Sequence, residues 1–253
     1  MARIVRENPM HPADVAGRIS DNEWQIYASV IDAAIAAGIP FALGGAFALA
    51  VYTRVWRNTK DLDLYILPQH RERMIALLSG LGLTDYYDKV PYDRQWIYRA
   101  TTDGVIVDLI WAMANHRAKV DATWITGPEV HIRGRAVKVL RPESILWDKL
   151  YIMQRERCDW PDVMNLLYEQ GPQLDWEEVL ARLDNDTSLL AGALSVFRWL
   201  APGIARRLPQ WLWKRVDVPP PAGQRLSRVD RRRAALLDSR PWFAQTKERR
   251  GHA

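Results

Sequence analysis

One short alternation, Asp61-Leu62-Asp63-Leu64, constrains this chain more than any other pattern in it. Residues two apart in a β-strand point to the same face, so the two carboxylates lie together while the leucines can enter the core. Neighbouring carboxylates on a partly buried strand repel each other, and burial adds to that cost. A divalent cation removes the cost, and all-oxygen ligands suit Mg²⁺. Taken alone, the alternation also fits a solvent-facing strand edge.

A third carboxylate, Asp108, interrupts the apolar segment Val105–Trp111. A lone aspartate buried there would be unpaired and costly. We therefore expect Asp108 either to join Asp61 and Asp63 in a metal-binding triad or to form a salt bridge with an arginine at the end of its strand. Asp103 is a competing candidate for the third acid.

A double glycine, Gly44-Gly45, lies between a short apolar run and a segment of small residues that we expect to be helical, 46–52. Glycines at such a junction let the backbone approach a phosphate chain, and a helix N-terminus favours its negative charge. The alternative is a packing turn. A lone Gly-Gly is weak evidence, but its position upstream of the Asp-x-Asp strand strengthens it.

Together these motifs resemble the polymerase β-like nucleotidyltransferase superfamily. The matching residues run from Leu43 to Gly45, from Arg57 to Leu64, and include Asp108. The Arg-x-Thr-x-Asp-x-Asp form is similar to the minimal bacterial nucleotidyltransferases, including the AbiEii-like branch, and the resemblance covers about residues 20–165. It implies an α+β fold: a small mixed β-sheet nucleotidyltransferase core flanked by helices, followed by a helical C-terminal half.

The resemblance also implies a reaction, the Mg²⁺-dependent transfer of an NMP group from an NTP to a hydroxyl acceptor. AMP from ATP is the expected group, and the acceptor is a small molecule, RNA or a protein. The expected metal ligands and catalytic residues, which would hold two Mg²⁺ ions, are Asp61, Asp63 and Asp108. The expected nucleotide-binding residues are Gly44, Gly45, Arg57, Thr59 and Lys149. Asp108 is the candidate for helping to deprotonate the acceptor.

Two other readings remain open at this point. The chain is alternatively a catalytically weak nucleotide-binding regulator, or a toxin–antitoxin component acting on tRNA or on a partner protein. Asp159 and Asp162 either cap the helix that follows them or belong to the basic turn, with Arg155 and Arg157, that the resemblance places after Lys149.

The spacing of apolar residues, together with helix-capping and helix-breaking residues, predicts how the chain is organised. Ser20 and Glu23 form a capping-box pattern, and apolar residues follow at helical spacing up to Gly38. Four further helices are expected over residues 143–155, 159–169, 176–183 and 188–200. We predict a nucleotidyltransferase core at 1–140, a helical region at 141–217, and a proline linker with a basic tail at 218–253.

The charge is unevenly distributed. The chain has 35 Lys and Arg against 30 Asp and Glu, but residues 206–253 alone hold 13 against 4. This tail is either a solvated extension or a contact for an anionic partner, and Leu236-Leu237 favours a short docked helix. A single cysteine, Cys158, excludes an intramolecular disulfide and a cysteine-cluster metal site. Because no apolar run reaches about 18 residues, we expect no membrane span and a cytoplasmic location.

Overall fold

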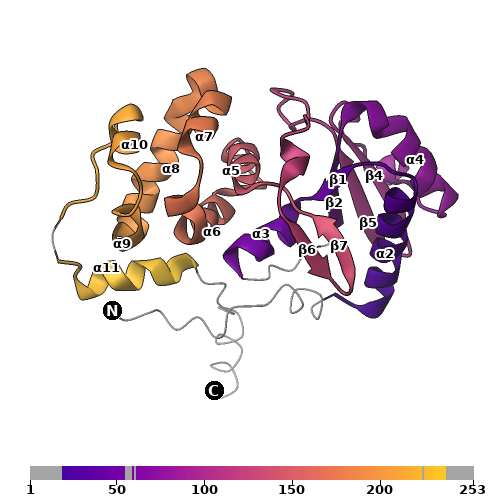
Figure 1. Ribbon diagram of the computed structural model, residues 1–253, viewed down its shortest axis with the longest axis horizontal. Coiled ribbons are helices and arrows are strands. Elements are labelled where there is room, and N and C mark those ends of the chain that lie inside the picture. Colours follow the sequence, from indigo (N-terminus) through magenta and orange to yellow (C-terminus); the bar gives the residue numbers. More distant parts are fainter. Residues whose placement is uncertain (1–18, 55–58, 60, 224, 238–253) are drawn as a thin grey trace, which may run out of the picture.

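The computed structural model of the chain describes residues 19–54, 59, 61–223 and 225–237. Figure 1 shows a sheet-containing half, with helices α2 and α4 on its outer side, beside a helical half. Helix α3 lies between the two. This arrangement confirms the predicted α+β class, in which a small mixed sheet flanked by helices is followed by a helical C-terminal half.

Five strands form the main sheet. Their order is β1 (Phe41–Leu43), β2 (Asp61–Ile66), β5 (Val105–Ile110), β4 (Ile97–Thr102) and β3 (Thr84–Asp85). The central pair, β2 and β5, is parallel, and every other pairing is antiparallel. The parallel register sets Asp63 directly opposite Asp108, so the two acidic segments meet in the middle of the sheet.

Helices α2 (Asp21–Ala36) and α4 (Arg71–Gly80) pack against each other beside the sheet. The predicted capping box begins α2, because the Ser20 hydroxyl accepts from the Glu23 amide and the Glu23 carboxylate accepts from the Ser20 amide. The buried face of α2 carries Trp24, Tyr27 and Ile31, as the helical spacing predicts. Helix α3 (Gly45–Thr53) follows β1 directly.

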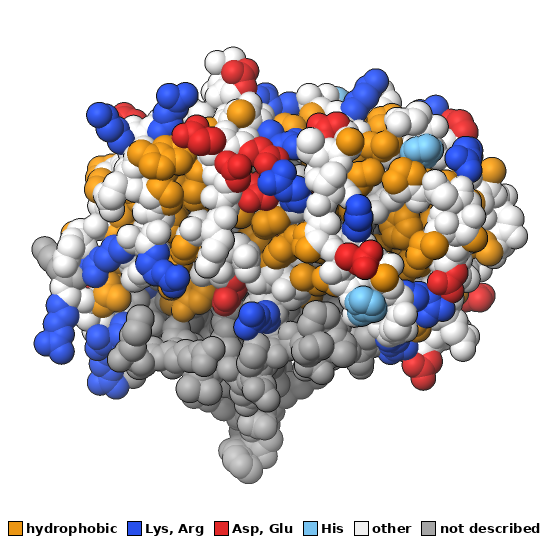
Figure 2. Space-filling view, viewed as in Figure 1, with side chains coloured by type: hydrophobic (Ala, Val, Ile, Leu, Met, Phe, Trp, Pro, Cys, Tyr) orange, Lys and Arg blue, Asp and Glu red, His pale blue; other side chains and the backbone are white. Residues whose placement is uncertain are grey.

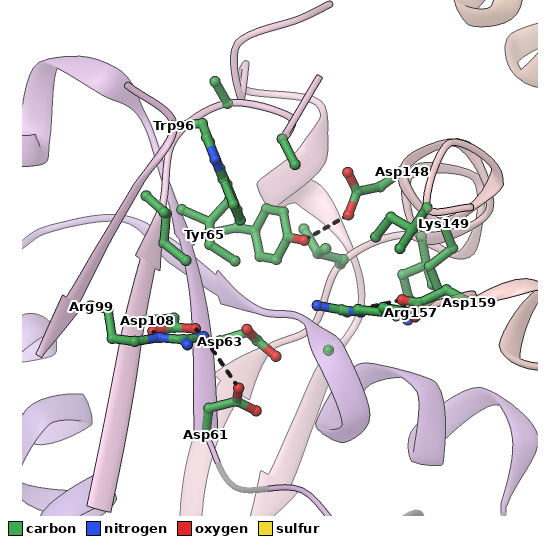
Figure 3. Close-up of a pocket in the computed structure, with 18 of the residues that line it drawn as sticks. Asp61, Asp63, Tyr65, Trp96, Arg99, Asp108, Asp148, Lys149, Arg157 and Asp159 are labelled. Atoms are coloured by element: carbon green, nitrogen blue, oxygen red, sulfur yellow. Dashed lines mark hydrogen bonds and ion pairs between the residues drawn. The ribbon is translucent and has the colours of Figure 1, made fainter. Parts of the chain in front are cut away.

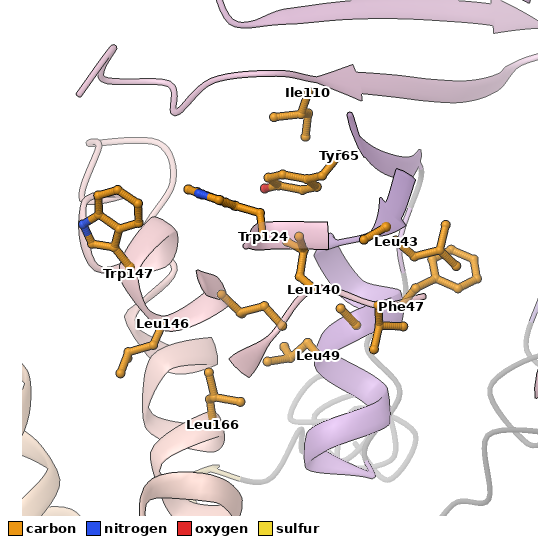
Figure 4. Packing of buried hydrophobic residues seen from close by; sticks show 14 of the residues in the cluster. Leu43, Phe47, Leu49, Tyr65, Ile110, Trp124, Leu140, Leu146, Trp147 and Leu166 are labelled. Atoms are coloured by element: carbon orange, nitrogen blue, oxygen red, sulfur yellow. The ribbon is translucent and has the colours of Figure 1, made fainter. Parts of the chain in front are cut away.

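One hydrophobic core runs from the sheet into the helical half. A second hairpin, β6 (Glu129–Ile132) with β7 (Arg135–Lys138), joins β1 through the Leu140 amide, which donates to the Leu43 carbonyl at 2.9 Å. Trp124 is fully buried, with its ring centroid 5.8 Å from that of Tyr65 on β2 and 5.4 Å from that of Trp147. Figure 4 shows these rings packed above leucines of α3, α5 and α6.

The helical half begins with α5 (Pro142–Leu150) and α6 (Trp160–Gln170). The remaining helices are α7 (Trp176–Leu183), α8 (Thr187–Leu200), α9 (Pro202–Ala205), α10 (Gln210–Arg215) and α11 (Arg228–Arg233). The last three are too short to show a helical period, and the sequence predicted no bounds for them, although Leu236-Leu237 favoured a short helix close to where α11 lies. No helix in the described part of the chain is both long and apolar enough to cross a membrane.

The helix predicted over residues 143–155 is wrong at its end, because α5 stops at Leu150. The chain then makes a tight turn in which the Gln154 amide donates to the Arg157 carbonyl at 2.7 Å. The Asp159 amide donates back to the Ile152 carbonyl at 2.9 Å. This α5–α6 turn (residues 151–159) lies beside the sheet and carries Arg157.

The start of the basic tail is docked on the body rather than fully solvated. The side chain of Leu237 packs against the core, as the sequence predicts, whereas Leu236 is 60% exposed. Residues 238–253 lie outside the described residues. The three sequence-based regions, 1–140, 141–217 and 218–253, stay predictions.

Candidate functional site

Asp61, Asp63 and Asp108 converge as the sequence predicts. One carboxylate oxygen from each lies within 4.8 Å of the others. Asp108 is almost wholly buried, at 1% exposure, whereas Asp61 and Asp63 are half-buried. The three line a cavity of about 490 Å³ between the sheet, α5 and the α5–α6 turn (Figure 3). The competing acid, Asp103, instead occupies the exposed turn between β4 and β5 with a positive φ of 49°.

The triad is electrostatically unfavourable without a cation. Burial, reinforced by the charges of Asp61 and Asp108, raises the pKa of Asp63 to about 8. Burial also raises the pKa of Asp108, although Arg99 acts in the opposite direction. Asp63 and Asp108 thus resist ionisation, and together with Asp61 they form an all-oxygen donor set able to hold a divalent metal ion.

Arg99 on β4 is a site residue that the sequence analysis missed. Its Nε donates to Oδ1 of Asp108 at 2.8 Å and its Nη2 to Oδ2 at 2.5 Å. The same Nη2 lies 3.7 Å from Oδ2 of Asp61. Asp108 therefore both converges with Asp61 and Asp63 and forms an arginine salt bridge, while metal binding by the three stays a prediction. The observed register, in which Thr102 pairs with Val105, places Arg99 directly opposite Asp108, and the sequence alone did not fix that register.

Gly44 and Gly45 lie where the sequence places them, at the junction of β1 and α3. Gly44 precedes α3, and its amide donates to the Asp63 carbonyl at 2.9 Å. Gly45 has a φ of +50°, and a Cβ there would lie 1.7 Å from Oδ2 of Asp63. Only glycine fits this close approach, which brings the N-terminus of α3 against the carboxylate cluster.

Thr59 also lines the cavity. Its hydroxyl donates to Oδ1 of Asp61 at 2.7 Å and therefore fixes the direction of that carboxylate. Arg57, the other nucleotide-binding candidate in this segment, lies outside the described residues.

The helical side of the cavity carries a buried ionic cluster around Lys149. The Lys149 ammonium donates to Oδ2 of Asp159 at 2.7 Å and to Oδ2 of Asp162 at 2.8 Å. Lys149 is thus not a solvated surface charge. Asp159 does precede α6, but its side chain does not cap that helix. The predicted side-chain cap is wrong because this carboxylate pairs with Lys149 and with Arg157, whose Nε and Nη2 each lie 3.0 Å from it.

Tyr65 and Asp148 link the two sides of the cavity. The Tyr65 hydroxyl on β2 donates to Oδ2 of Asp148 on α5 at 2.9 Å. Burial raises the pKa of Asp148 despite this hydrogen bond. Figure 3 shows Arg157 reaching from the α5–α6 turn toward Asp63. No sequence pattern indicated a role for Tyr65 or Asp148, because their contact depends on how α5 docks on the sheet.

A comparison with known protein families gives one match. Residues 26–199 match a protein family described as "Uncharacterised nucleotidyltransferase", and the chain belongs to that family. A comparison with curated protein sequences finds no match.

Solved structures with a similar fold include the antibiotic-resistance factor ANT(2″)-Ia, at 20% sequence identity and a TM-score of 0.48. That match covers 69% of this chain and 96% of the other. The lincosamide antibiotic adenylyltransferase LnuA matches at 16% identity and a TM-score of 0.42, over 58% of this chain and 96% of the other. A nucleotidyltransferase-like protein from Paracoccidioides brasiliensis matches at 21% identity and a TM-score of 0.39, over 69% and 93%.

The family match confirms the nucleotidyltransferase resemblance and the enzyme class. The finer resemblance to the AbiEii-like branch is not confirmed.

Proposed function

We propose that this chain, a member of a nucleotidyltransferase family, transfers an NMP group from an NTP to a hydroxyl acceptor. The observation that carries the proposal is the convergence of Asp61, Asp63 and Asp108 within 4.8 Å, beside the N-terminus of α3. A carboxylate cluster next to a glycine-flanked helix N-terminus combines a cation site with an anion site, which is what a metal-bound triphosphate needs. The proposals that ATP is the donor and that two metal ions bind rest on the resemblance to polymerase β-like nucleotidyltransferases.

The three aspartates are the proposed ligands of Mg²⁺. Their donor atoms are all carboxylate oxygens, which matches the preference of this ion. The raised pKa of Asp63 supports the assignment, because a bound cation would offset the burial and the carboxylate repulsion that raise it. When bound, Mg²⁺ would neutralise phosphate charge that develops during the transfer.

The proposed nucleotide contacts come from both sides of the cavity. The backbone of Gly44 and Gly45 and the first turn of α3 receive the phosphates. Thr59 orients Asp61. Lys149 uses two of its three N–H groups on Asp159 and Asp162, which leaves one for a phosphate oxygen. Arg157, whose side chain is 58% exposed, adds a second cation at the cavity. Arg57 keeps its proposed nucleotide role.

In the proposed reaction the acceptor hydroxyl attacks the α-phosphorus in line with the leaving oxygen. A new oxygen–phosphorus bond forms, and the bond from the α-phosphorus to the bridging oxygen breaks and releases pyrophosphate. The hydroxyl proton passes to the Asp108 carboxylate, which Arg99 holds in a fixed orientation. The rest of the catalysis is positioning and charge neutralisation.

The test incubates the purified protein with each labelled NTP, Mg²⁺, and cell RNA, protein or metabolite fractions. The wild type should label one fraction and release pyrophosphate, and the labelled fraction identifies the acceptor class. The double variant Asp61→Asn with Asp63→Asn should lose both signals. Asp103→Asn is the matched control, because Asp103 is exposed and Asn tolerates its positive φ.

Three outcomes separate the alternatives. Full activity in the double variant would overturn the site assignment. Mg²⁺-dependent NTP binding without pyrophosphate release would identify a nucleotide-binding regulator instead. Growth arrest on expression, relieved by Asp63→Ala, would identify a toxin that acts on tRNA or on a partner.

A further inference from the structure

The basic end of the chain forms a surface that the transfer reaction does not use. From residue 198 to 237 the sequence holds ten Lys and Arg against two acids, Asp217 and Asp230. Figure 2 shows Lys and Arg side chains at the lower left of the molecule, where α9 and α11 lie in Figure 1. This end lies across the helical half from the catalytic cavity.

Three segments come together at this surface. Leu226 lies against Gly203, since a Cβ on that glycine would be 3.0 Å from a Leu226 methyl carbon. Residues 225–228 therefore run beside α9, and Arg207 follows α9 directly. The Arg233 guanidinium carbon lies 5.0 Å from the centre of the Trp199 ring, which joins α11 to the end of α8. We name this surface the α8–α11 patch and define it by Trp199, Arg207, Arg225, Arg228 and Arg231.

The arginines of the patch differ in what they contact from three exposed or half-buried arginines of the sheet half. There, Arg94 pairs with Asp85, Arg133 with Asp21, and Arg135 with Asp32. In the patch, Arg207, Arg225 and Arg228 are exposed and have no carboxylate partner among the described residues. Arg231 donates to the Leu226 carbonyl, which leaves its positive charge unneutralised. Exposed cations held close together repel one another and favour a polyanion.

Trp199 adds a second kind of contact. It remains 53% exposed although Arg233 lies over its ring. An exposed indole beside guanidinium groups can stack an unpaired base while the arginines contact the phosphates on either side of it. A membrane surface fits less well. Helices α9 and α11 have only four and six residues, and interfacial membrane helices need a longer apolar face.

We propose that the α8–α11 patch binds single-stranded RNA, with arginines on the phosphates and Trp199 against a base. This binding goes beyond the transfer reaction, because it needs neither nucleotide nor metal and is measured in their absence. The RNA-binding proposal does not depend on the acceptor of the transfer reaction and would hold if that acceptor were a small molecule.

The test measures binding of the full chain to a fluorescein-labelled oligouridine by fluorescence anisotropy over a series of KCl concentrations. The patch variant carries Arg207→Gln, Arg225→Gln and Arg228→Gln. The matched control carries Lys89→Gln, Lys119→Gln and Lys138→Gln, which removes the same charge from exposed positions outside the patch. Circular dichroism confirms that both are folded.

The patch variant should bind about tenfold more weakly or worse, and its plot of log affinity against log salt should be shallower by about 2. The reason is that each lost phosphate contact removes roughly 0.7 from the slope on a single strand. The control should keep the wild-type slope. Trp199→Leu should weaken binding by about fivefold or more and leave the slope unchanged, because stacking releases no counterions.

Two results would overturn the proposal. Equal losses of RNA affinity in the patch variant and the control would show that only net charge matters. The second result is that the patch variant binds RNA as the wild type does but no longer sediments with phosphatidylserine vesicles. That result would identify the patch as a membrane contact.

Discussion

Arg99 and Asp108 stand opposite each other on adjacent antiparallel strands, and Arg99 donates a hydrogen bond to each oxygen of the Asp108 carboxylate. This pair occupies the same face of the sheet as Asp61 and Asp63. The positive charge of Arg99 therefore partly balances three carboxylates in the metal-free protein. Its removal should matter most when no divalent cation is present.

Arg99→Met should lower the free energy of unfolding by about 3 kcal/mol without metal, because it leaves Asp108 buried and uncompensated. Saturating Mg²⁺ should restore part of this loss. Urea unfolding with and without Mg²⁺ measures both effects. Arg94→Met is the control, since it breaks an exposed salt bridge with Asp85 that contributes about 1 kcal/mol or less. A loss for Arg99→Met no larger than that of the control would contradict the prediction.

Gly45→Ala should cost about 2 kcal/mol or more. The new Cβ would overlap Oδ2 of Asp63, and the positive φ of Gly45 strains any L-residue. Pyrophosphate release should fall with the fold intact, because Asp63 must move. Gly80→Ala, at the end of α4 with open space around the new Cβ, should change stability by less than about 1 kcal/mol. Thermal unfolding compares the two, and similar losses in both would count against the close approach at Gly45.

Variants of Lys149 and Arg157 should affect different properties of the protein: the first its stability, the second its affinity for NTP. Lys149→Met leaves Asp159 and Asp162 facing each other in a buried site, so it should cost about 3 kcal/mol or more of stability. Arg157→Gln changes a side chain that is 58% exposed, and should cost about 1 kcal/mol or less. Its main effect should be a roughly tenfold weaker affinity for NTP, from the loss of one charged phosphate contact. Urea unfolding and calorimetric titration with a non-hydrolysable NTP measure the two properties. Unchanged NTP affinity in Arg157→Gln would remove that residue from the nucleotide site.

Protonation of Asp159 should lower the free energy of unfolding of the protein in acid. Burial favours the neutral acid, but the hydrogen bonds and charges of Arg157 and Lys149 prevail and lower the pKa of Asp159 to about 2. The unfolded chain, with a pKa of about 3.9, takes up the proton first as the pH falls. This contribution, about 2 kcal/mol, is therefore present above about pH 4 and is lost as the pH falls through about 2.

Urea unfolding at a series of acidic pH values tests this dependence. Asp159→Asn should lose stability at neutral pH and show a flatter profile below about pH 4. Asp103→Asn, at an exposed position, should keep the wild-type profile. A variant profile as steep as that of the wild type would show that other groups dominate acid unfolding.

The sheet side of the candidate site was largely predictable because strand geometry is local. Residues 61 and 63 share a face in any strand, and an isolated aspartate in an apolar strand needs a partner. Gly44-Gly45 before a run of small residues marks a strand-to-helix junction. These inferences need no knowledge of how distant helices dock, and the sheet order then places the three acids together.

The helical side of the site was not predictable in the same way. The Tyr65–Asp148 contact joins residues on two elements whose relative position depends on burial of Trp124 and Trp147. Asp159 shows the general difficulty. Its position before α6 is typical of a capping residue, yet two neighbouring cations compete for its side chain more strongly than the helix amides. The tendency to cap a helix depends on neighbouring residues in the sequence, whereas the ionic cluster depends on contacts that the tertiary structure makes.

The parallel pairing of β2 with β5 has a consequence for how the protein folds. Asp108 comes beside Asp63 only after the chain between them, with α4, β3 and β4, has returned to the centre of the sheet. A β-hairpin alone brings Arg99 to Asp108, so that pair can form early, whereas the triad depends on a long loop closure. Divalent-cation affinity is therefore a kinetic marker of sheet completion. In a refolding experiment it should develop with the slowest structural phase rather than with the hairpin.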